Sequence, residues 1–180
     1  MAPSMTPGAP TVEPLDEAVD HVRGSGTGRV ILEYGDYECP YSRRAYREIQ
    51  KVEHQLGDEV RFAFRHFPLT EIHPHAAGAA AAAEAAALQG RFWDAHDLLF
   101  HRQQALEEDD LRRYATELGL DLTRFDHDRD DDAVLRRVAR DMRSGIASGQ
   151  VLGTPTLFLD GAVYGGGHDA PSLIEALTRT

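Results

Sequence analysis

The pattern of apolar and polar positions predicts a β-α-β unit near the start of the chain. Apolar β-forming residues fill positions 30–32, which is typical of a buried strand. After a break at Gly35, apolar residues recur at helical spacing over 45–56, and Gly57 ends that run. Residues 60–65 then alternate with a period of two, as in a half-buried strand. Two strands joined by a helix are expected to lie parallel to one another.

The middle of the chain, from 74 to about 149, has an almost wholly helical pattern. It begins with an alanine-rich segment over 76–88, which Gly90 closes. Apolar residues then recur every three or four positions, the period of a helix with one buried face. These further helices are expected within 92–100, 111–118 and 134–146.

The β pattern returns at 156–160, and the Asp160-Gly161 pair favours a two-residue hairpin turn. Asp169 is placed to cap a last helix. The predicted class is therefore α/β, with a β-α-β half, a helical insertion over about 74–149, and a β-β-α half.

Length and composition favour one globular domain. The chain has 180 residues, of which 42% are hydrophobic and 27% charged, so we expect a single domain over 15–180 and a flexible tail over 1–14. A net charge of −11 argues against a nucleic-acid partner, which would require a basic patch. The tail lacks the pattern of a signal peptide, and no run reaches the roughly 20 apolar residues that span a bilayer. These features predict a cytoplasmic protein with no membrane partner.

The one cysteine, Cys39, lies between the first predicted strand and helix, directly before Pro40. Proline is favoured at the first position of a helix. The N–H groups that converge at a helix start favour the thiolate form of a nearby cysteine. A lone cysteine is otherwise often a small buried hydrophobic residue. Its position at this junction favours a nucleophile.

Two further positions are candidates. Glu33 lies in the apolar strand six residues before Cys39. Burial would raise its pKa and let it relay protons for the thiol; the alternative is a solvent-facing residue at the end of the strand. Thr154-Pro155 precedes the second β segment. Because X-Pro bonds are cis in only about 5–6% of cases, the residues alone indicate an ordinary trans turn.

The histidines show no spacing typical of a metal site, which needs three or four convergent ligands. We therefore predict no bound metal. His66 and His96 are interpreted as packed or capping residues. The other histidines considered are His73, His75 and His101.

Five separated blocks carry a resemblance to a known family. They read E-Y-G-D-Y-E-C-P-Y-S (33–42), R-H-F-P-L (65–69), H-P-H-A-A (73–77), F-W-D-A-H-D-L-L-F (92–100) and G-T-P-T-L-F-L-D-G (153–161). Over roughly 20–178, the chain resembles the DsbA-like branch of the thioredoxin superfamily, whose members are thiol-disulfide oxidoreductases. The resemblance implies a thioredoxin-like fold with a helical insertion.

The resemblance also implies roles for individual residues. Cys39 would be the attacking thiol, and Glu33 matches the buried acid of the family. Pro155 would be cis and adjacent to Cys39, and the backbone of Thr154 would dock the extended chain of a substrate. The residues expected to bind substrate are Pro40, Tyr41, Thr154 and Pro155.

The chain departs from the family at Ser42, because the motif here is C-P-Y-S where the family has C-P-Y-C. In the two-cysteine motif, the second sulfur resolves the mixed disulfide that the first one forms. A hydroxyl cannot displace a thiolate, so this chain cannot hold an internal catalytic disulfide. We expect the Ser42 hydroxyl to donate a hydrogen bond to Cys39 instead.

The predicted function is that of a monothiol oxidoreductase acting on a disulfide-bearing protein or a small thiol substrate. No tightly bound cofactor is expected. Glutathione, mycothiol or a similar low-molecular-weight thiol would resolve the mixed disulfide. Three alternatives stay open at this point: an engineered replacement of cysteine at position 42, a redox-inactive peptide-binding module, and an enzyme like the kappa-class glutathione transferases and isomerases, which use a serine near this site.

Overall fold

The computed structural model describes residues 12–179. Its centre is a five-stranded sheet in the order β1-β3-β2-β4-β5. The parallel pair β2 (Arg29–Gly35) and β3 (Val60–His66) is connected by helix α1 (Pro40–Leu56), which a short 3-10 turn, η1 (Gly57–Glu59), follows. This is the predicted β-α-β half, and the predicted α/β class is confirmed.

The remaining strands are antiparallel to their neighbours. β1 (His21–Arg23) pairs with β3, β4 (Thr156–Leu159) pairs with β2, and β5 (Ala162–Val163) pairs with β4. The chain then ends in helix α7 (Ala170–Thr178). β2 therefore lies at the centre of the sheet, and its backbone pairs with β3 on one edge and with β4 on the other.

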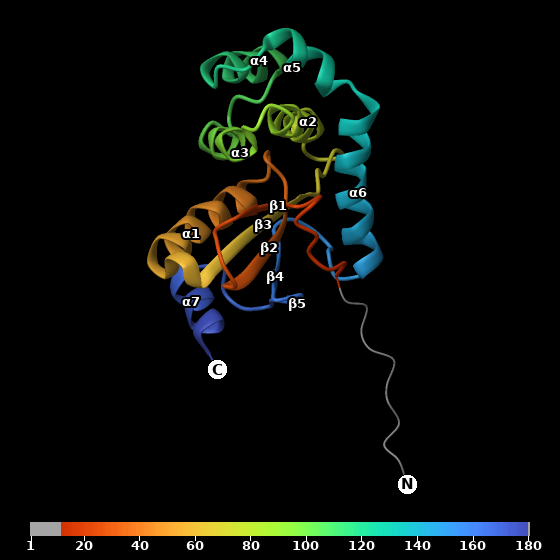
Figure 1. Ribbon diagram of the computed structural model, residues 1–180. Coiled ribbons are helices and arrows are strands. Elements are labelled where there is room, and N and C mark those ends of the chain that lie inside the picture. The colour runs from red at the N-terminus through yellow and green to blue at the C-terminus, as the bar shows by residue number, and fades with distance from the viewer. Residues whose placement is uncertain (1–11, 180) are drawn as a thin grey trace.

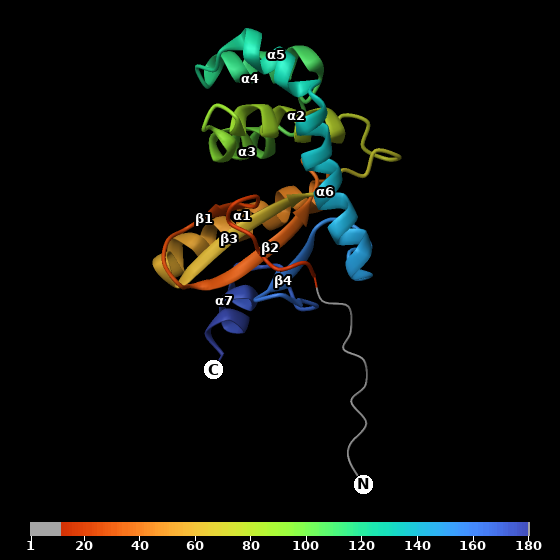
Figure 2. The ribbon, with the colours of Figure 1, turned by 45° about the vertical axis from the view of Figure 1, so that its right-hand side comes forward.

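Five helices form the insertion between β3 and β4. They are α2 (Ala76–Ala87), α3 (Phe92–His101), α4 (Glu108–Glu117), α5 (Leu122–Arg129) and α6 (Asp132–Ser148). Figures 1 and 2 show α2 to α5 stacked beyond the end of the sheet at which β2 and β3 finish, while α6 runs back along the sheet. The insertion thus covers the end of the sheet where the chain leaves β2 for Cys39.

The two faces of the sheet bury separate apolar clusters, because side chains alternate along each strand. One face carries Ile31 and Phe64 and packs on α1, α7 and the insertion. The other face carries Leu32 and Phe158 and packs on Val12 and residues near α6. The alternation places Glu33, two positions from Ile31, on the face that α1 covers.

Residues 12–14 differ from the predicted flexible tail. Val12 is buried against the second face of the sheet. The carbonyl groups of Glu13 and Pro14 accept hydrogen bonds from the guanidinium of Arg65, at 2.9 and 3.1 Å. Arg65 is itself fully buried and needs these acceptors, so it holds this segment in place. The rest of the predicted tail, residues 1–11, lies outside the described residues.

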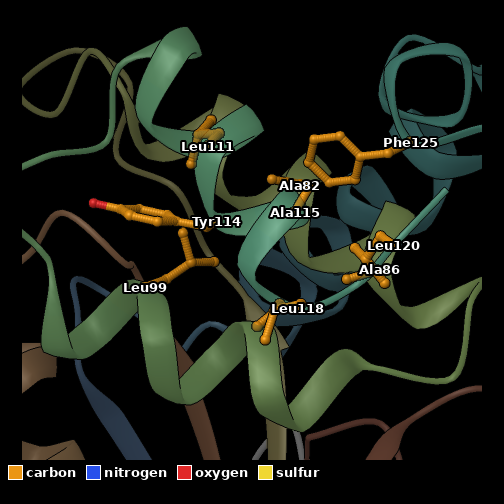
Figure 3. Close-up of a pocket in the computed structure, with 10 residues that line it drawn as sticks. Ala82, Ala86, Leu99, Leu111, Tyr114, Ala115, Leu118, Leu120 and Phe125 are labelled. Carbon is orange, nitrogen blue, oxygen red and sulfur yellow. The ribbon is translucent and has the colours of Figure 1, made fainter. Parts of the chain in front are cut away.

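The apolar side chains of the insertion continue the cluster that covers the first face of the sheet, and Figure 3 shows the part of it that lies between the helices. Side chains from α2, α3, α4 and α5 meet there around a cavity of about 10 Å³. That volume is about one water probe, so this is a packing defect and not a ligand site. The labelled lining residues are Ala82, Ala86, Leu99, Leu111, Tyr114, Ala115, Leu118, Leu120 and Phe125.

Over residues 12–179, no helix combines the length and the apolar character that crossing a membrane requires.

Candidate functional site

Cys39 lies at the junction of β2 and α1, as the N-cap residue of the helix. Pro40 is the first helical residue, in agreement with its preference for that position. The Cys39 side chain makes no capping bond to the helix. Sγ lies 3.3 Å from the carbonyl oxygen of Thr154, to which it donates. The residue is only 3% exposed.

Thr154 and Pro155 form a loop between α6 and β4, and the peptide bond between them is cis. The sequence places this loop 115 positions from Cys39, and the sheet brings the two together because β4 pairs with β2. Thr154 contributes its carbonyl, while its hydroxyl Oγ1 is buried and has no hydrogen-bond partner among the described residues. The two candidate segments therefore form one site.

Ser42 lies one helical turn beyond Cys39 and is fully buried. Its hydroxyl oxygen accepts a hydrogen bond from the backbone N–H of Asp36, at 3.2 Å. Within the described part of the chain, no hydrogen bond joins the Ser42 hydroxyl to the Cys39 sulfur. The structure therefore does not show the expected Ser42–Cys39 bond. The Ser42 hydroxyl instead accepts from Asp36 N–H and holds the turn before the cysteine, because short serine side chains readily bond to nearby backbone groups.

Glu33 is fully buried on β2, and neither of its carboxylate oxygens has a hydrogen-bond partner among the described residues. Burial of the carboxyl raises its pKa to about 8, so the group is protonated at neutral pH. The carboxylate leans toward Gly35, where an added Cβ would lie 2.7 Å from Glu33 Oε1. Glycine at position 35 therefore gives the acid its space, at the end of the strand that leads to Cys39.

Two acid–histidine pairs hold the turn between Gly35 and Cys39. Asp36 Oδ2 lies 2.8 Å from His73 Nδ1, and Glu38 Oε1 lies 2.9 Å from His75 Nδ1. The hydrogen bond that the His75 ring donates to the Glu38 carboxylate raises the pKa of His75. Sequence reasoning missed these contacts, although a signal was present: both acids and both histidines are spaced two residues apart. The pairs tie this turn to the segment before α2.

Tyr37 and His96 form a buried polar pair behind the turn. Tyr37 Oη lies 3.0 Å from His96 Nδ1, and both side chains are almost fully enclosed by aromatic residues. Burial raises the pKa of Tyr37 well above its usual range and lowers that of His96 well below its own. Both groups are neutral at pH 7. The prediction that His96 is a packed residue is confirmed.

Glu84, in the alanine-rich helix α2, is a further acid that the sequence reasoning missed. Its Oε1 lies 2.8 Å from His21 Nε2 and 2.8 Å from His66 Nε2. Burial alone would raise the pKa of Glu84, but the hydrogen bonds from the two histidines outweigh it and lower the pKa. Within residues 12–179, no group of three His, Cys, Asp or Glu side chains is arranged to hold a metal ion.

Large apolar side chains are exposed at positions next to the site. Tyr41 is 69% exposed and lies two residues beyond Cys39, after the exposed Pro40. Leu152 is 92% exposed and lies two residues before Thr154. These positions flank the thiol from both segments of the site and are available to a ligand.

Comparisons with known proteins fit this geometry. The thioredoxin family model (Thioredoxin_4) matches residues 17–179. A thioredoxin-like oxidoreductase from Silicibacter pomeroyi is 29% identical, with a TM-score of 0.77 over 89% of this chain and 91% of that chain. α-DsbA1 from Wolbachia pipientis has the same fold at 18% identity, with a TM-score of 0.74 over 91% of this chain and 92% of that chain.

The curated relatives are longer proteins. The chain is 43% identical over 180 residues to the Na(+)/H(+) antiporter NhaA 1 of Mycolicibacterium gilvum, a match that covers 98% of this chain. It spans 29% of the length of that relative. Because the family model matches nearly the whole chain, and the solved structures share its fold, the protein belongs to the thioredoxin family.

Proposed function

We propose that this protein is a thiol-disulfide oxidoreductase in which Cys39 alone attacks a substrate disulfide and carries the mixed disulfide. The observation that carries the proposal is the placement of Cys39 Sγ at the start of α1, 3.3 Å from the carbonyl of Thr154 before cis-Pro155. A thiolate in this position is stabilised by the positive end of the helix dipole.

The reaction is a balanced exchange of sulfur bonds. The Cys39 thiolate attacks one sulfur of the substrate, a new S–S bond forms, and the substrate S–S bond breaks. The departing sulfur leaves as a thiolate and takes up a proton. The thiolate of a low-molecular-weight thiol such as glutathione or mycothiol then attacks the substrate sulfur of the mixed disulfide, which releases Cys39 as a thiolate.

Ser42 fixes the identity of the resolving group in this scheme. It occupies the position one turn beyond Cys39, but its oxygen cannot form the second disulfide. Its hydrogen bond from Asp36 N–H supports the shape of the turn. The resolving sulfur must therefore come from outside the chain.

Glu33 serves as the proton relay in the proposed cycle. Because its pKa is about 8, the carboxyl holds a proton at neutral pH and can still release it. It has no partner among residues 12–179 that would fix the proton, and its carboxyl leans toward the strand end that leads to Cys39. The Glu33 carboxyl can thus store the proton that is exchanged when Cys39 changes between thiol and thiolate.

Substrate would bind across Pro40, Tyr41, Thr154 and Pro155. The exposed ring of Tyr41 and the exposed Leu152 favour a substrate with apolar residues next to its cysteine. The backbone of Thr154 would pair with the extended chain of that substrate, as a strand pairs with the edge of a sheet. A protein with a partly unfolded, disulfide-bearing segment fits this surface.

Intact-mass analysis after incubation with glutathione disulfide tests the proposal. We expect one glutathione adduct on Cys39, which excess reduced thiol removes within the same experiment. The Cys39→Ser variant should give no adduct, because the chain has no other cysteine.

Two results would decide against the proposal. An adduct that forms no faster on the folded protein than on the same protein in guanidinium chloride would favour a redox-inactive peptide-binding module. Conjugation of glutathione to an aryl halide by the Cys39→Ser variant would favour an enzyme of the kappa-class transferase type, in which Ser42 and not Cys39 acts on the thiol.

A further inference from the structure

Gln103 connects the helical insertion to the catalytic turn. It follows α3, and its side chain is buried against the turn between β2 and α1. Its amide nitrogen Nε2 donates to two backbone carbonyls at once, that of Tyr37 at 2.7 Å and that of Cys39 at 2.8 Å. A primary amide carries two hydrogens, so this geometry uses both of them.

The catalytic turn needs such a support because of the reaction it serves. An N-cap residue usually fixes its own position by a side-chain bond to the first amides of the helix. Cys39 makes no bond of that kind. Its backbone bonds are one from its N–H to Asp36, at 3.1 Å, and one from Arg43 N–H to its carbonyl, at 3.1 Å. Gln103 adds a second donor to that carbonyl without using the sulfur.

The carbonyls of Tyr37 and Cys39 lie before and after the peptide bond that joins Glu38 to Cys39. Fixing both of them limits rotation of the turn and hence of the bond that directs Sγ toward Thr154. Disulfide exchange requires the attacking sulfur to approach along the S–S bond, and a displacement of about 1 Å can cost a large factor in rate. A small alkylating reagent moves freely in solution and can orient itself to the sulfur, so its reaction depends less on the exact position of the turn.

We propose that Gln103 is a positioning residue for Cys39 in disulfide exchange. It touches no reacting atom and acts only through the backbone of the turn. The inference rests on the proposed function, and it assigns to the insertion an indirect part in the reaction, through the backbone of the turn. Attack by Cys39 forms the mixed disulfide as described above, with no additional reactant.

The test compares two reactions of Cys39 in the same variants. Gln103→Met keeps the length of the side chain and removes both donors, and Gln103→Glu replaces them with acceptors that face two carbonyls. We expect each change to slow attack on a peptide disulfide by about tenfold. Alkylation by iodoacetamide at the same pH should change less than about twofold, because that reaction needs a thiolate and the small free reagent can orient itself to the sulfur.

Gln89→Met is the matched control, because Gln89 also bridges two segments of the insertion through backbone bonds to Asp121, at 3.1 and 2.8 Å. It should leave both rates unchanged. Circular dichroism at the assay temperature confirms that each protein is folded. If Gln103→Met does not fold, Gln103→Asn, which draws the amide back by one methylene, is expected to show the same selective loss.

The outcomes separate this inference from the proposed function. Equal rates in wild type and both Gln103 variants, with wild type reacting rapidly, would overturn only the role of Gln103. Parallel loss of exchange and alkylation would also overturn it, because that result indicates general disruption of the turn. A wild-type protein that fails to react with the peptide disulfide would contradict the proposed function itself.

Discussion

Two buried glutamates near the end of the sheet where β2 and β3 finish differ in the direction in which their pKa values are shifted. Glu33, on β2, has no hydrogen-bond partner among the described residues, and burial raises its pKa to about 8. Glu84, on α2, is almost as deeply buried, but two histidines contact one of its oxygens, and its pKa is lowered. Burial alone thus does not decide the charge of an acid; its partners do.

The comparison separates an acid that can exchange a proton near neutral pH from one that stays ionised there. A partnered carboxylate stabilises the fold and keeps its charge, so it cannot exchange a proton near neutral pH. An unpartnered carboxyl destabilises the fold when it ionises, but it is able to store and release a proton there. Of the two, only Glu33 lies on the strand that leads to Cys39.

The largest expected effect is on the pH dependence of stability. Because the pKa of Glu33 is about 8 in the fold and 4.5 in the unfolded chain, the native state holds a proton that the unfolded state has lost between those pH values. The free energy of unfolding should therefore fall as pH rises from 4.5 to 8, by at most about 5 kcal/mol at about 1.4 kcal/mol per pH unit.

Glu33→Gln should remove that fall and make the protein more stable than wild type at pH 8 to 9. Urea unfolding at a series of pH values measures the effect, and Glu71→Gln, at an exposed position, is the control. Parallel stability curves for wild type and Glu33→Gln would show that the acid is not protonated in the fold.

Glu84→Ala should act in the opposite direction. It leaves His21 and His66 without their shared acceptor, and breaking a buried ionic contact in this way costs about 3–5 kcal/mol. A group with a lowered pKa contributes stability above its unfolded value of 4.5, so the deficit should shrink as pH falls below that value.

Guanidinium unfolding at pH 7 and at pH 4 measures the Glu84 effect. Glu117→Ala removes an exposed ion pair with Arg102, which solvent screens, and should cost far less stability than Glu84→Ala. A Glu84 variant as stable as this control would remove the distinction between the two acids.

The same Glu33→Gln substitution should slow exchange at Cys39 by about tenfold at pH 7, because an amide cannot relay protons. The readout is the initial rate of mixed-disulfide formation with a peptide disulfide, measured by mass spectrometry under conditions where both proteins are folded. An unchanged rate at every pH would leave Glu33 without a catalytic role.

The smallest expected effect belongs to Ser42→Ala. It removes the acceptor of the Asp36 N–H bond, which costs about 1 kcal/mol of stability. Because the hydroxyl makes no hydrogen bond to the sulfur, the rate of Cys39 alkylation at pH 7 should change less than about twofold. A tenfold slower reaction would show that Ser42 stabilises the thiolate after all.

The sequence predicts much of the fold because its signals are local. Apolar runs and glycine stops mark β2 and α1, and the helical period marks the insertion. The order of elements then follows from known connections between strands. Residues 12–14 show the limit of such local signals. Composition favours a flexible tail there, but the buried Arg65 guanidinium donates to the carbonyls of Glu13 and Pro14 and holds the segment against the sheet.

The site is only partly predictable, for a related reason. Cys39 and Glu33 are marked by their place in a buried strand and at a helix start. Glu84 and Gln103 depend on contacts between residues far apart in the sequence, so no local pattern reveals them. The Ser42 hydroxyl was expected at the sulfur, but a backbone N–H in the preceding turn is its donor.

The most direct test of the central claim is turnover with a small thiol. The protein is mixed with a peptide disulfide and excess reduced glutathione or mycothiol, and release of the peptide thiol is followed over many equivalents of enzyme. The single-cysteine mechanism predicts steady turnover by wild type and none above background by Cys39→Ser. Wild-type release that stops after one equivalent, or equals that of Cys39→Ser, would contradict it.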